Sequence, residues 1–478
     1  MIKCIDDALA GFRICFSRSA TWKWFIVIVV GLMVRTDRLG VTSIVRSLAI
    51  APSLYVPMLD FFRSSAWSLD SLMPVWWARL MQCAPIMIED GAVVLAGDGV
   101  KESKEGRKMP GTKKMHQESD NSSKAEYIWG HLFGGVGVLA SVGTKCFCIP
   151  LALLLQDGVK TIFSWEKQAE RQGSHVVELI NLAFRPAKVF GKAIVLLDRL
   201  YLTVPALERL DHLNAAEKVL RVITKAKSNC TAYLDPMVKA KPRRGRPAKK
   251  GGPIKVFDLF KAKTSQFKDA TVELYGKKEA IRYMHTDLLW GKKLYKRLRF
   301  VLVAYGDNRA VLVSTDLTLD PLKIILLYGK RFGIECMFRE MKQVVDAFGY
   351  HFWSKSMPKM NKRRKKTDPD PLEKINRKQE QEKIMRAVKA TEGFVFCAIV
   401  ATGLLQLISL KFSGTMEMSR TRFLRTPSKV VASEATMADF LRKNIFRLLG
   451  GSPHLAVSRI ILDKQSVYDE LFDHDEVA

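Results

Sequence analysis

Three carboxylates occupy positions where they could act together in one site. Asp98 and Asp198 each follow a short apolar run, 92–96 and 193–197, which is typical of a buried strand that ends at a turn. Glu335 lies in a segment whose periodicity predicts a helix over 322–345. Converging carboxylates repel one another unless divalent cations neutralise them, and hard oxygen ligands favour Mg²⁺ or Mn²⁺. Two such ions, ~3.5–4 Å apart, can activate an attacking oxygen and stabilise a leaving one during phosphoryl transfer.

One face of this predicted helix is polar, although the rest of the helix is largely apolar. At about 100° per residue, the polar face holds Tyr328, Arg331, Glu335 and Lys342, whereas Glu340 falls on the other side of Glu335. The partner face, which we expect to pack into a core, carries Ile325, Phe332, Met337 and Met341. A row of surface ion pairs is one explanation of the polar face. A carboxylate held among phosphate-binding groups is the other.

The elements around these residues predict a mixed α/β fold. Strand-like runs at 127–139 and 145–155, a helical segment at 166–184 and the run 193–197 indicate a mixed sheet with helices. The strand-like stretches 270–275 and 298–305 indicate a mostly β insertion, and 310–314 returns to a core strand. A long apolar helix is expected over about 379–411.

We predict five regions along the chain. They are a helical N-terminal DNA-binding region (1–90), a first part of the catalytic domain (91–200), a β-rich insertion with a basic loop (201–308), a second part of the catalytic domain (309–430) and a C-terminal region (431–478). Within the first region, helices over 38–52 and 54–63 fit either a helix-turn-helix-like unit or an ordinary helical hairpin.

The polar face of the helix resembles the Y-R-E-K signature of DDE insertion-sequence transposases. That signature is Tyr, two residues, Arg, three residues, Glu, six residues, Lys, and residues 328–342 match it without a gap. Gly97-Asp98-Gly99, Leu196-Leu-Asp198 and the β insertion before Glu335 also look like this class. The resemblance covers roughly residues 35–430 and implies an RNase H-like catalytic domain.

The resemblance also implies roles for individual residues. Asp98, Asp198 and Glu335 would be the catalytic acids and the ligands of two Mg²⁺ or Mn²⁺ ions. Tyr328, Arg331 and Lys342 would contact the phosphates of the transposon end. Trp290 is a possible counterpart of the aromatic residue with which the insertion of relatives stacks on a flipped base. Asp316 is a rival acid at a strand end, although a cap for the following helix explains it better.

The charge of the chain points to a polyanionic partner. The 77 Lys and Arg against 48 Asp and Glu leave a net charge of +29, more than an acidic small-molecule substrate requires. Twelve residues, 239–250, include seven basic ones, and Arg244-Gly-Arg246-Pro247 resembles the core of an AT-hook. This loop either reads A·T-rich DNA or is a solvated basic loop. The basic run 359–366 is either a phosphate clamp or a charged connector.

Composition excludes several other classes of protein. With 48% apolar and 26% charged residues, the chain is neither disordered nor fibrous. The eight cysteines form no C-x-x-C pair, which indicates reduced thiols in a cytoplasmic protein rather than a disulfide framework or a zinc site. The uncharged stretch 393–410 fits a buried core helix or a membrane span; we expect a core helix and no membrane.

These observations together predict a DNA transposase. We expect metal-dependent cleavage at the terminal inverted repeats, transfer of the freed 3′-hydroxyl into target DNA by a cut-and-paste route, and a homodimer on double-stranded DNA. An RNase H-fold nuclease without strand transfer is the enzymatic alternative. A domesticated DNA-binding protein that has lost its chemistry is the non-enzymatic one.

Overall fold

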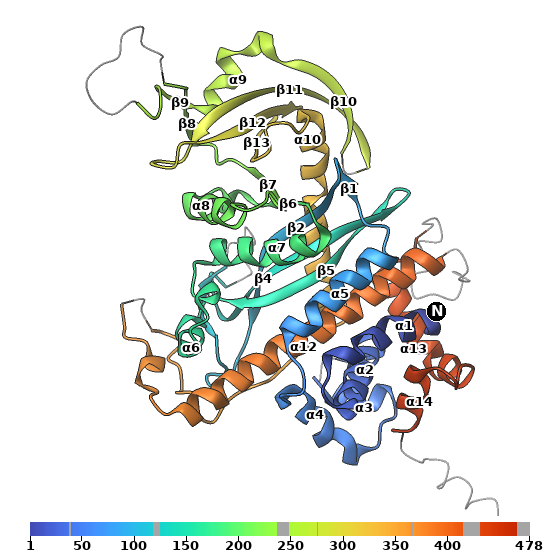
Figure 1. The fold of residues 1–478 in the computed structure, drawn as a ribbon. Coiled ribbons are helices and arrows are strands. Elements are labelled where there is room, and N and C mark those ends of the chain that lie inside the picture. Colours follow the sequence, from blue (N-terminus) through green and yellow to red (C-terminus); the bar gives the residue numbers. More distant parts are fainter. Residues whose placement is uncertain are drawn as a thin grey trace, which may run out of the picture.

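The computed structural model describes most of the chain, namely residues 1–37, 40–117, 125–236, 248–274, 276–364, 367–413 and 431–465. Within these residues one mixed sheet of thirteen strands crosses the molecule, with helices on both faces (Figure 1). The strands are β1 (Ile88–Glu89), β2 (Ala92–Ser103), β3 (Lys113–His116), β4 (Tyr127–Val142), β5 (Lys145–Gln156), β6 (Ala193–Leu197), β7 (Leu220–Lys225), β8 (Thr231–Tyr233), β9 (Pro253–Lys255), β10 (Lys268–Leu274), β11 (Lys277–Trp290), β12 (Lys296–Tyr305) and β13 (Asn308–Ser314).

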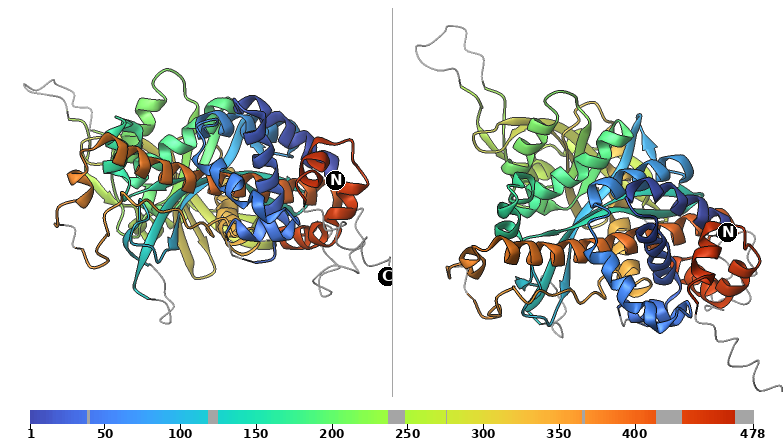
Figure 2. Two further views of the ribbon diagram at one scale, coloured as in Figure 1. Left: turned by 90° about the horizontal axis from the view of Figure 1, so that it is seen from below. Right: turned by 60° about the horizontal axis from the view of Figure 1, so that its bottom comes forward.

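The helices group at the two ends of the chain and between the strands. They are α1 (Ile2–Ala10), α2 (Ser19–Val34), α3 (Thr42–Ser47), α4 (Tyr55–Arg63), α5 (Leu69–Cys83), α6 (Lys160–Trp165), α7 (His175–Phe190), α8 (Val204–Leu213), α9 (Leu259–Ala262), α10 (Pro321–Gly329), α11 (Gly333–Gln343), α12 (Lys378–Phe412), α13 (Glu434–Gly450) and α14 (Ala456–Leu462). Two views from other sides show α1 to α4 beside α13 and α14, away from β10 to β13 (Figure 2).

The order of strands confirms the predicted mixed α/β class. β5, β4 and β2 pair antiparallel, β2, β6 and β7 pair parallel, and β13, β12 and β11 continue the sheet antiparallel. Every residue of β6 is buried, as expected for a central strand covered by helices on both faces. The predicted β-rich character of the middle region is confirmed by β8 to β13, while the predicted region boundaries stay predictions, since the sheet runs across them without a break.

The predicted turn at Asp98 is wrong. β2 does not end at Gly97 but continues to Ser103, because its pairing with β4 extends from Leu95 to Ser103. Its parallel neighbour β6 ends at Leu197, so only that side of β2 becomes free at Asp98. Asp98 therefore lies inside a strand, whereas Asp198 follows its strand as predicted.

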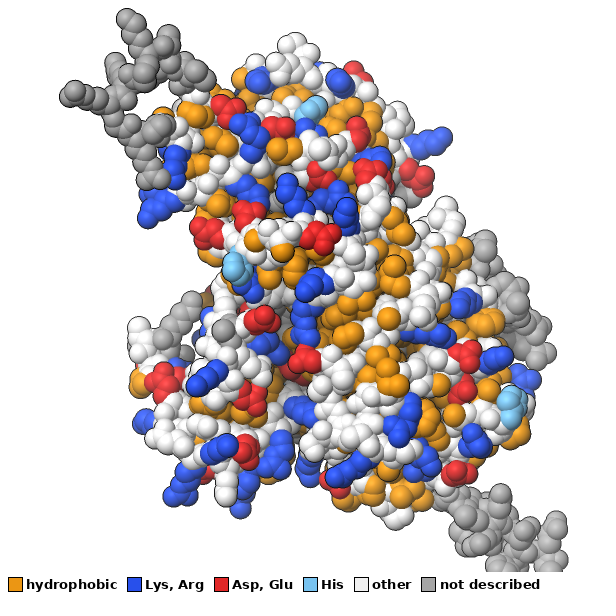
Figure 3. Space-filling model, viewed as in Figure 1, with side chains coloured by type: hydrophobic (Ala, Val, Ile, Leu, Met, Phe, Trp, Pro, Cys, Tyr) orange, Lys and Arg blue, Asp and Glu red, His pale blue; other side chains and the backbone are white. Residues whose placement is uncertain are grey.

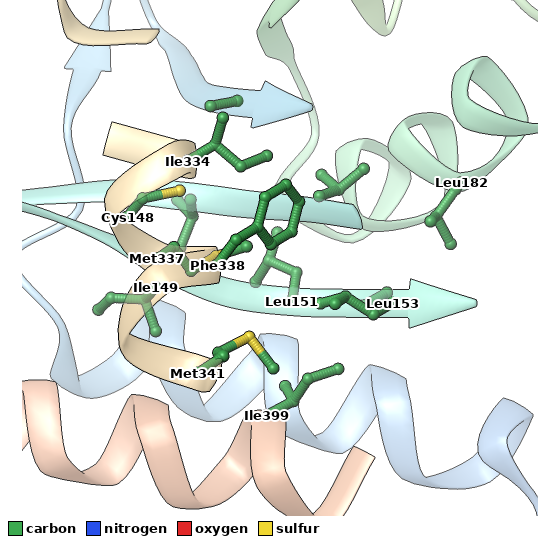
Figure 4. Packing of buried hydrophobic residues seen from close by; sticks show 14 of the residues in the cluster. Cys148, Ile149, Leu151, Leu153, Leu182, Ile334, Met337, Phe338, Met341 and Ile399 are labelled. Carbon is green, nitrogen blue, oxygen red and sulfur yellow. The ribbon is translucent and has the colours of Figure 1, made fainter. Parts of the chain in front are cut away.

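Helix α11 packs on the sheet through apolar residues, of which Met337 and Met341 had been assigned to a core from the sequence pattern. Met337 and Phe338 face β5, Met341 lies beside Ile399 of α12 (Figure 4), and Ile334 belongs to the same buried cluster. Glycines of β4 permit this approach: a Cβ on Gly135 would lie 2.7 Å from the Phe338 ring. The close contact fixes the depth and the rotation of α11 over β2 and β4.

Two helix predictions around this region need correction. The segment predicted as one helix over 322–345 is α10 and α11, joined by a 3₁₀ turn at Lys330–Phe332. A 3₁₀ turn advances about 120° per residue instead of 100°, so the phase of the helix shifts there. Phe332, which was expected in the core, is consequently 51% exposed, whereas Ile325, Met337 and Met341 are buried as predicted. The helix predicted at 166–184 starts later, at His175, after α6 and a 3₁₀ turn.

The N-terminal region is helical as predicted, with one boundary in error. In the segment predicted as a helix over 38–52, the described part is helical only in α3, because Ile50 leaves the helix to form a β-bridge with Gln465. Helix α4 agrees with the predicted 54–63. Both helices bury apolar side chains, among them Ile44, Phe61 and Phe62. Whether this region binds DNA stays a prediction.

The long apolar helix α12 is buried along its apolar stretch. It is the one helix of the described residues that could cross a membrane by length and composition, and 94% of its apolar window is covered by the rest of the fold. It packs against β5, α2 and α4, which confirms the prediction of a buried helix at 393–410. All eight cysteines are free thiols, in agreement with the sequence pattern.

A buried carboxyl group, that of Glu392, lies near the middle of α12. Glu392 accepts hydrogen bonds from the Leu155 N–H (2.9 Å) and from Arg171 (2.5 Å). Glu178 on α7 is also buried, but neither of its carboxylate oxygens has a hydrogen-bond partner among the described groups. Burial raises the pKa of Glu178 to about 8, and the cation of Arg171 only partly opposes this.

Adding a methyl group at Gly135 tests the seat of α11. Gly135→Ala should lower the free energy of unfolding by about 1–3 kcal/mol, because the Cβ would overlap the Phe338 ring. Thermal or chemical unfolding measures the loss. Gly11→Ala is the control, since no atom lies within 4 Å of the added Cβ and the backbone there is helical. Equal stability of the two variants would contradict the packing described.

The pKa of Glu178 predicts a pH dependence of stability. An unfolded glutamate loses its proton near pH 4.3, whereas folded Glu178 holds it up to about pH 8. Between these values the folded state binds more protons, so stability falls as the pH rises. Glu178→Gln should remove this slope, so that its stability relative to the wild type rises with pH, by up to about 5 kcal/mol at pH 8. Unfolding midpoints from pH 5 to 8 measure it, with Glu208→Gln at an exposed position as control.

Candidate active site

Arg331 joins two of the three predicted acids. Its Nη1 atom lies 3.0 Å from Oδ2 of Asp98 on β2, and its Nη2 atom lies 2.6 Å from Oε1 of Glu335 on α11. The guanidinium group is only 15% exposed, so water screens these ion pairs less than it would on an open surface. One side chain thus holds together a strand and a helix that are far apart in the sequence.

The third predicted acid lies beside Asp98 in the sheet. Gly97 of β2 pairs with Leu197 of the parallel strand β6, so Asp98 and Asp198 are the next residues in that register. Adjacent strands lie about 4.8 Å apart, which brings the two aspartates into neighbouring positions. The Asp198 carbonyl accepts a hydrogen bond from the Thr224 hydroxyl of β7 (2.8 Å), which fixes the chain where it leaves the sheet.

The surroundings of Asp98 shift its pKa in opposite directions. Burial raises the pKa of Asp98, and the charge of Asp198 adds to that rise. The Arg331 guanidinium and the Gly99 N–H, which donates to Oδ1 at 2.7 Å, both lower it, but the net shift of the pKa is upward. Any further positive charge close to Asp98 would stabilise the ionised form of its carboxyl group.

Tyr201 belongs to the same site although the sequence pattern did not reveal it. It is buried in the 3₁₀ turn Arg199–Tyr201 that follows Asp198, and its hydroxyl lies 3.8 Å from the position of a Cβ on Gly99. Burial, and then the charges of Asp98 and Asp198, raise the pKa of its phenol, so the hydroxyl keeps its proton. The only sequence signal is a tyrosine three residues after an acid that ends a strand.

The other two members of the predicted polar face lie on either side of Arg331. Tyr328 is half-buried on α10 and contributes, after Asp98, to raising the pKa of Arg331 against the opposing effect of burial. Lys342, at the far end of α11, contacts Glu102 of β2 (2.9 Å) and donates to the Lys101 carbonyl (2.9 Å). The structure therefore brings Arg331 and Lys342 against β2, with Tyr328 near Arg331.

Trp290 lies in a separate pocket close to Asp198. This pocket has a volume of about 300 Å³, and its wall includes Arg199 and Leu202 from the turn after Asp198, together with Lys227 and Lys292. The indole N–H of Trp290 forms a hydrogen bond with the Cys230 thiol, which holds the ring in place. Its surroundings are basic, as a DNA-contacting position requires.

Two predictions cannot be placed and one is wrong. Arg244 and Arg246 lie outside the described residues. Asp316 is not the cap of the next helix: it binds Arg221 and Thr318, while Asp320 accepts the N–H groups of Leu322 and Lys323 at the start of α10. His131 of β4 is buried and forms hydrogen bonds with the Tyr350 hydroxyl and the Pro110 carbonyl.

Carboxylate oxygens, which suit a hard cation, lie around Arg331, but they are too far apart to share one ion. In the part of the chain that the structure describes, no three His, Cys, Asp or Glu side chains are close enough to hold a metal ion. The space between Asp98 and Glu335 is instead bridged by the Arg331 cation. Carboxylate oxygens are the type of ligand that Mg²⁺ and Mn²⁺ prefer.

Comparison with known proteins gives one match. A family model described as DDE superfamily endonuclease matches residues 11–282, more than half of the chain. The matched range contains Asp98 and Asp198 and ends before α10 and α11. No curated protein and no solved structure matches the chain significantly.

Removing the Arg331 charge tests the bridge between β2 and α11. Arg331→Gln should lower the free energy of unfolding at pH 7 by about 1–3 kcal/mol, because Asp98 and Glu335 lose their common partner. In an Asp98→Asn background the same substitution should cost clearly less. Arg339→Gln on the exposed side of α11 is the control and should change stability by under about 0.5 kcal/mol. Additive losses from Arg331 and Asp98 would argue against the ion pair.

Proposed function

Because the chain belongs to the DDE superfamily of endonucleases, we propose that it is a DNA transposase of the insertion-sequence type. The observation that carries the proposal is that Arg331 pairs with both Asp98 and Glu335, while Asp198 follows the strand next to that of Asp98. Glu335 lies beyond the range that the family model matches, yet it shares the Arg331 cation with Asp98. An RNase H-like catalytic core with the Y-R-E-K residues on α10, the 3₁₀ turn and α11 fits this arrangement.

Asp98, Asp198 and Glu335 are the residues that would hold the divalent ions. Two Mg²⁺ or Mn²⁺ ions supply Lewis-acid chemistry in this class of reaction, by activating the attacking oxygen and stabilising the leaving one. Burial raises the pKa of Asp98, and the Arg331 cation opposes that rise only in part. Arg331 must release at least one carboxylate for all three to share an ion.

The cationic side chains of α11 and the turn before it would then turn to the DNA. A guanidinium group released from a carboxylate can bind a phosphate by two parallel hydrogen bonds. Lys342 of α11 contacts the same strand, β2, and would bind a second phosphate. Tyr328 lies near Arg331. The protonated Tyr201 hydroxyl helps to keep Asp98 and Asp198 in position and can donate a hydrogen bond.

The substrate we propose is double-stranded DNA that carries the terminal inverted repeats of a transposon, together with target DNA. The net charge of +29 supports strong, salt-dependent phosphate binding. The basic pocket around Trp290 supports the stacking of a base displaced from the duplex. Arg244 and Arg246 would add minor-groove contacts.

The reaction is proposed as cleavage at each transposon end followed by strand transfer. In-line attack by water frees a 3′-hydroxyl, which then attacks a phosphodiester of the target at the same site; each step forms one P–O bond and breaks another. Cutting two ends together calls for a homodimer on DNA, acting in the cytoplasm where the free thiols stay reduced. A nuclease that cuts without strand transfer is the second candidate, favoured if only the first step occurs.

Two glutamates of the same helix give a matched test of the proposal. Glu335→Gln should abolish Mg²⁺- or Mn²⁺-dependent nicking of a duplex carrying the DNA that flanks the gene, with a loss of at least about a hundredfold. Glu340→Gln should leave nicking nearly unchanged, because Glu340 pairs with Arg339 away from Arg331. A gel assay with and without EDTA measures both.

The products of that assay separate the candidates. Joined products between the cut end and a second duplex support the transposase. Nicking without joining favours the nuclease. Binding with no cleavage by the wild type, on DNA with both ends, would overturn both and favour the domesticated DNA-binding protein.

A further inference from the structure

A second basic pocket lies at the far end of β2, away from Trp290. It has a volume of about 550 Å³ and forms between the segment 103–109, which follows β2, and the segment 351–359, which follows α11. Its wall includes Lys104, Arg107, Lys108, His351, Trp353 and Lys359. It shares no lining residue with the pocket of Trp290.

Trp353 is the most exposed tryptophan in the described chain, at 63%. Its neighbours are anchored: Phe352 packs on Phe62, and the Ser354 N–H donates to the Lys108 carbonyl at 3.2 Å. A large aromatic ring on a fixed backbone loses little conformational entropy when something stacks on it. Exposure of such a ring in a concave site marks a binding surface.

Hydrogen bonds between the two segments hold the pocket open. Two hydrogen bonds join Arg107 and Met360. The Met360 N–H donates to the Arg107 carbonyl (2.9 Å), and the Arg107 Nε donates to the Met360 carbonyl (2.7 Å). Lys104 is buried, lies 4.0 Å from the centre of the Tyr350 ring and donates to the Phe348 and Tyr350 carbonyls. Lys104 therefore braces the pocket, while Arg107, Lys108 and Lys359 line it.

The charges of the pocket favour an anion. Four cationic residues, counting Lys104, face one carboxylate, Glu105, which is 3.2 Å from Lys362. In the space-filling view, Lys and Arg side chains also gather along the lower left edge of the molecule (Figure 3). An anion with an aromatic face matches both features, since the ring of Trp353 and the cations lie in the same pocket.

The pocket lies in line with the catalytic carboxylates. Asp98, Glu102 and Lys104 lie on the same face along β2 and the residue after it. Asp98 contacts Arg331, Glu102 contacts Lys342, and Lys104 contacts the segment after α11. Six residues of strand from Asp98 to Lys104 span about 20 Å at ~3.4 Å each, roughly six steps along a DNA strand. Lys342, between the two sites, lies where a strand that joins them would pass.

We propose that this pocket binds an unpaired nucleotide of a DNA strand that runs past Asp98, Asp198 and Glu335. The base stacks on Trp353, and Arg107, Lys108 and Lys359 hold the adjoining phosphates. The proposal rests on the DNA-cleaving function proposed above and adds a single-strand site to it. It assigns to β2 two tasks, catalysis at Asp98 and strand guidance at its far end.

Binding without cleavage tests the pocket directly. A short duplex with a single-stranded tail, of either polarity and with 2-aminopurine in the tail, is titrated in EDTA with full-length protein. The wild type should quench the fluorescent base and prefer tailed over blunt duplex. Trp353→Ala should lose roughly tenfold in affinity for the tailed duplex and most of the quenching, and Trp353→Phe should retain them. Phe446→Ala, at a 46% exposed aromatic on α13, is the control.

Each outcome decides one of the two proposals. Equal quenching and equal tail preference in the wild type and Trp353→Ala overturn the nucleotide pocket, provided both unfold at the same temperature. Competition of the tail by polyglutamate as well as by single-stranded DNA would assign the pocket to acidic peptides instead. If tail binding depends on Trp353 while no variant ever nicks DNA, the pocket stands and the transposase proposal fails.

Discussion

The double ion pair of Arg331 is the interaction on which the arrangement of the site depends. It ties the inside of β2 to the start of α11, and both elements need other features to reach it. The glycines of β4 let Phe338 settle on the sheet, and α12 supports Met341 from the other side. Parallel pairing of β2 with β6 then puts Asp198 beside Asp98. If α11 were raised by the width of one methyl group, the guanidinium could no longer serve both carboxylates with short bonds.

Arg331 also offsets the repulsion between the carboxylates of the site. Asp98 and Glu335 each pair with its guanidinium group, and the Arg331 charge lowers the pKa of Asp98 against the effect of burial. A guanidinium group suits this place because its planar fork can bind two carboxylates at once and stays charged when partly buried. The same fork is equally suited to a phosphate. In the proposed reaction, one side chain would therefore exchange a carboxylate partner for a phosphate of the DNA.

Local patterns predicted the elements, and long-range pairing decided what they could not. The buried strands β4, β5, β6 and β13 and the helix α12 agree with their apolar runs, because burial on both faces leaves a continuous signal. Asp98 was expected at a turn since glycines flank it, but pairing with β4, invisible in the local sequence, extends the strand. Phe332 is exposed because the chain changes from α to 3₁₀ geometry there, whereas the sequence pattern was evaluated at a constant 100° per residue. Tyr201 could not be found because its relation to Asp98 exists only across two strands.

The burial of α2 by α12 has a consequence for biosynthesis. Helix α2 (Ser19–Val34) is translated well before α12 and α13, which cover much of it. At ~5–20 residues per second, the nearly 380 residues between the end of α2 and the end of α12 take on the order of half a minute. During that time α2 can pack only on nearby partners such as α3 and α4, so that part of its apolar surface stays uncovered and makes the nascent chain a client for chaperones. The same order of synthesis keeps Glu335 away from Asp98 and Asp198 until α11 has been translated.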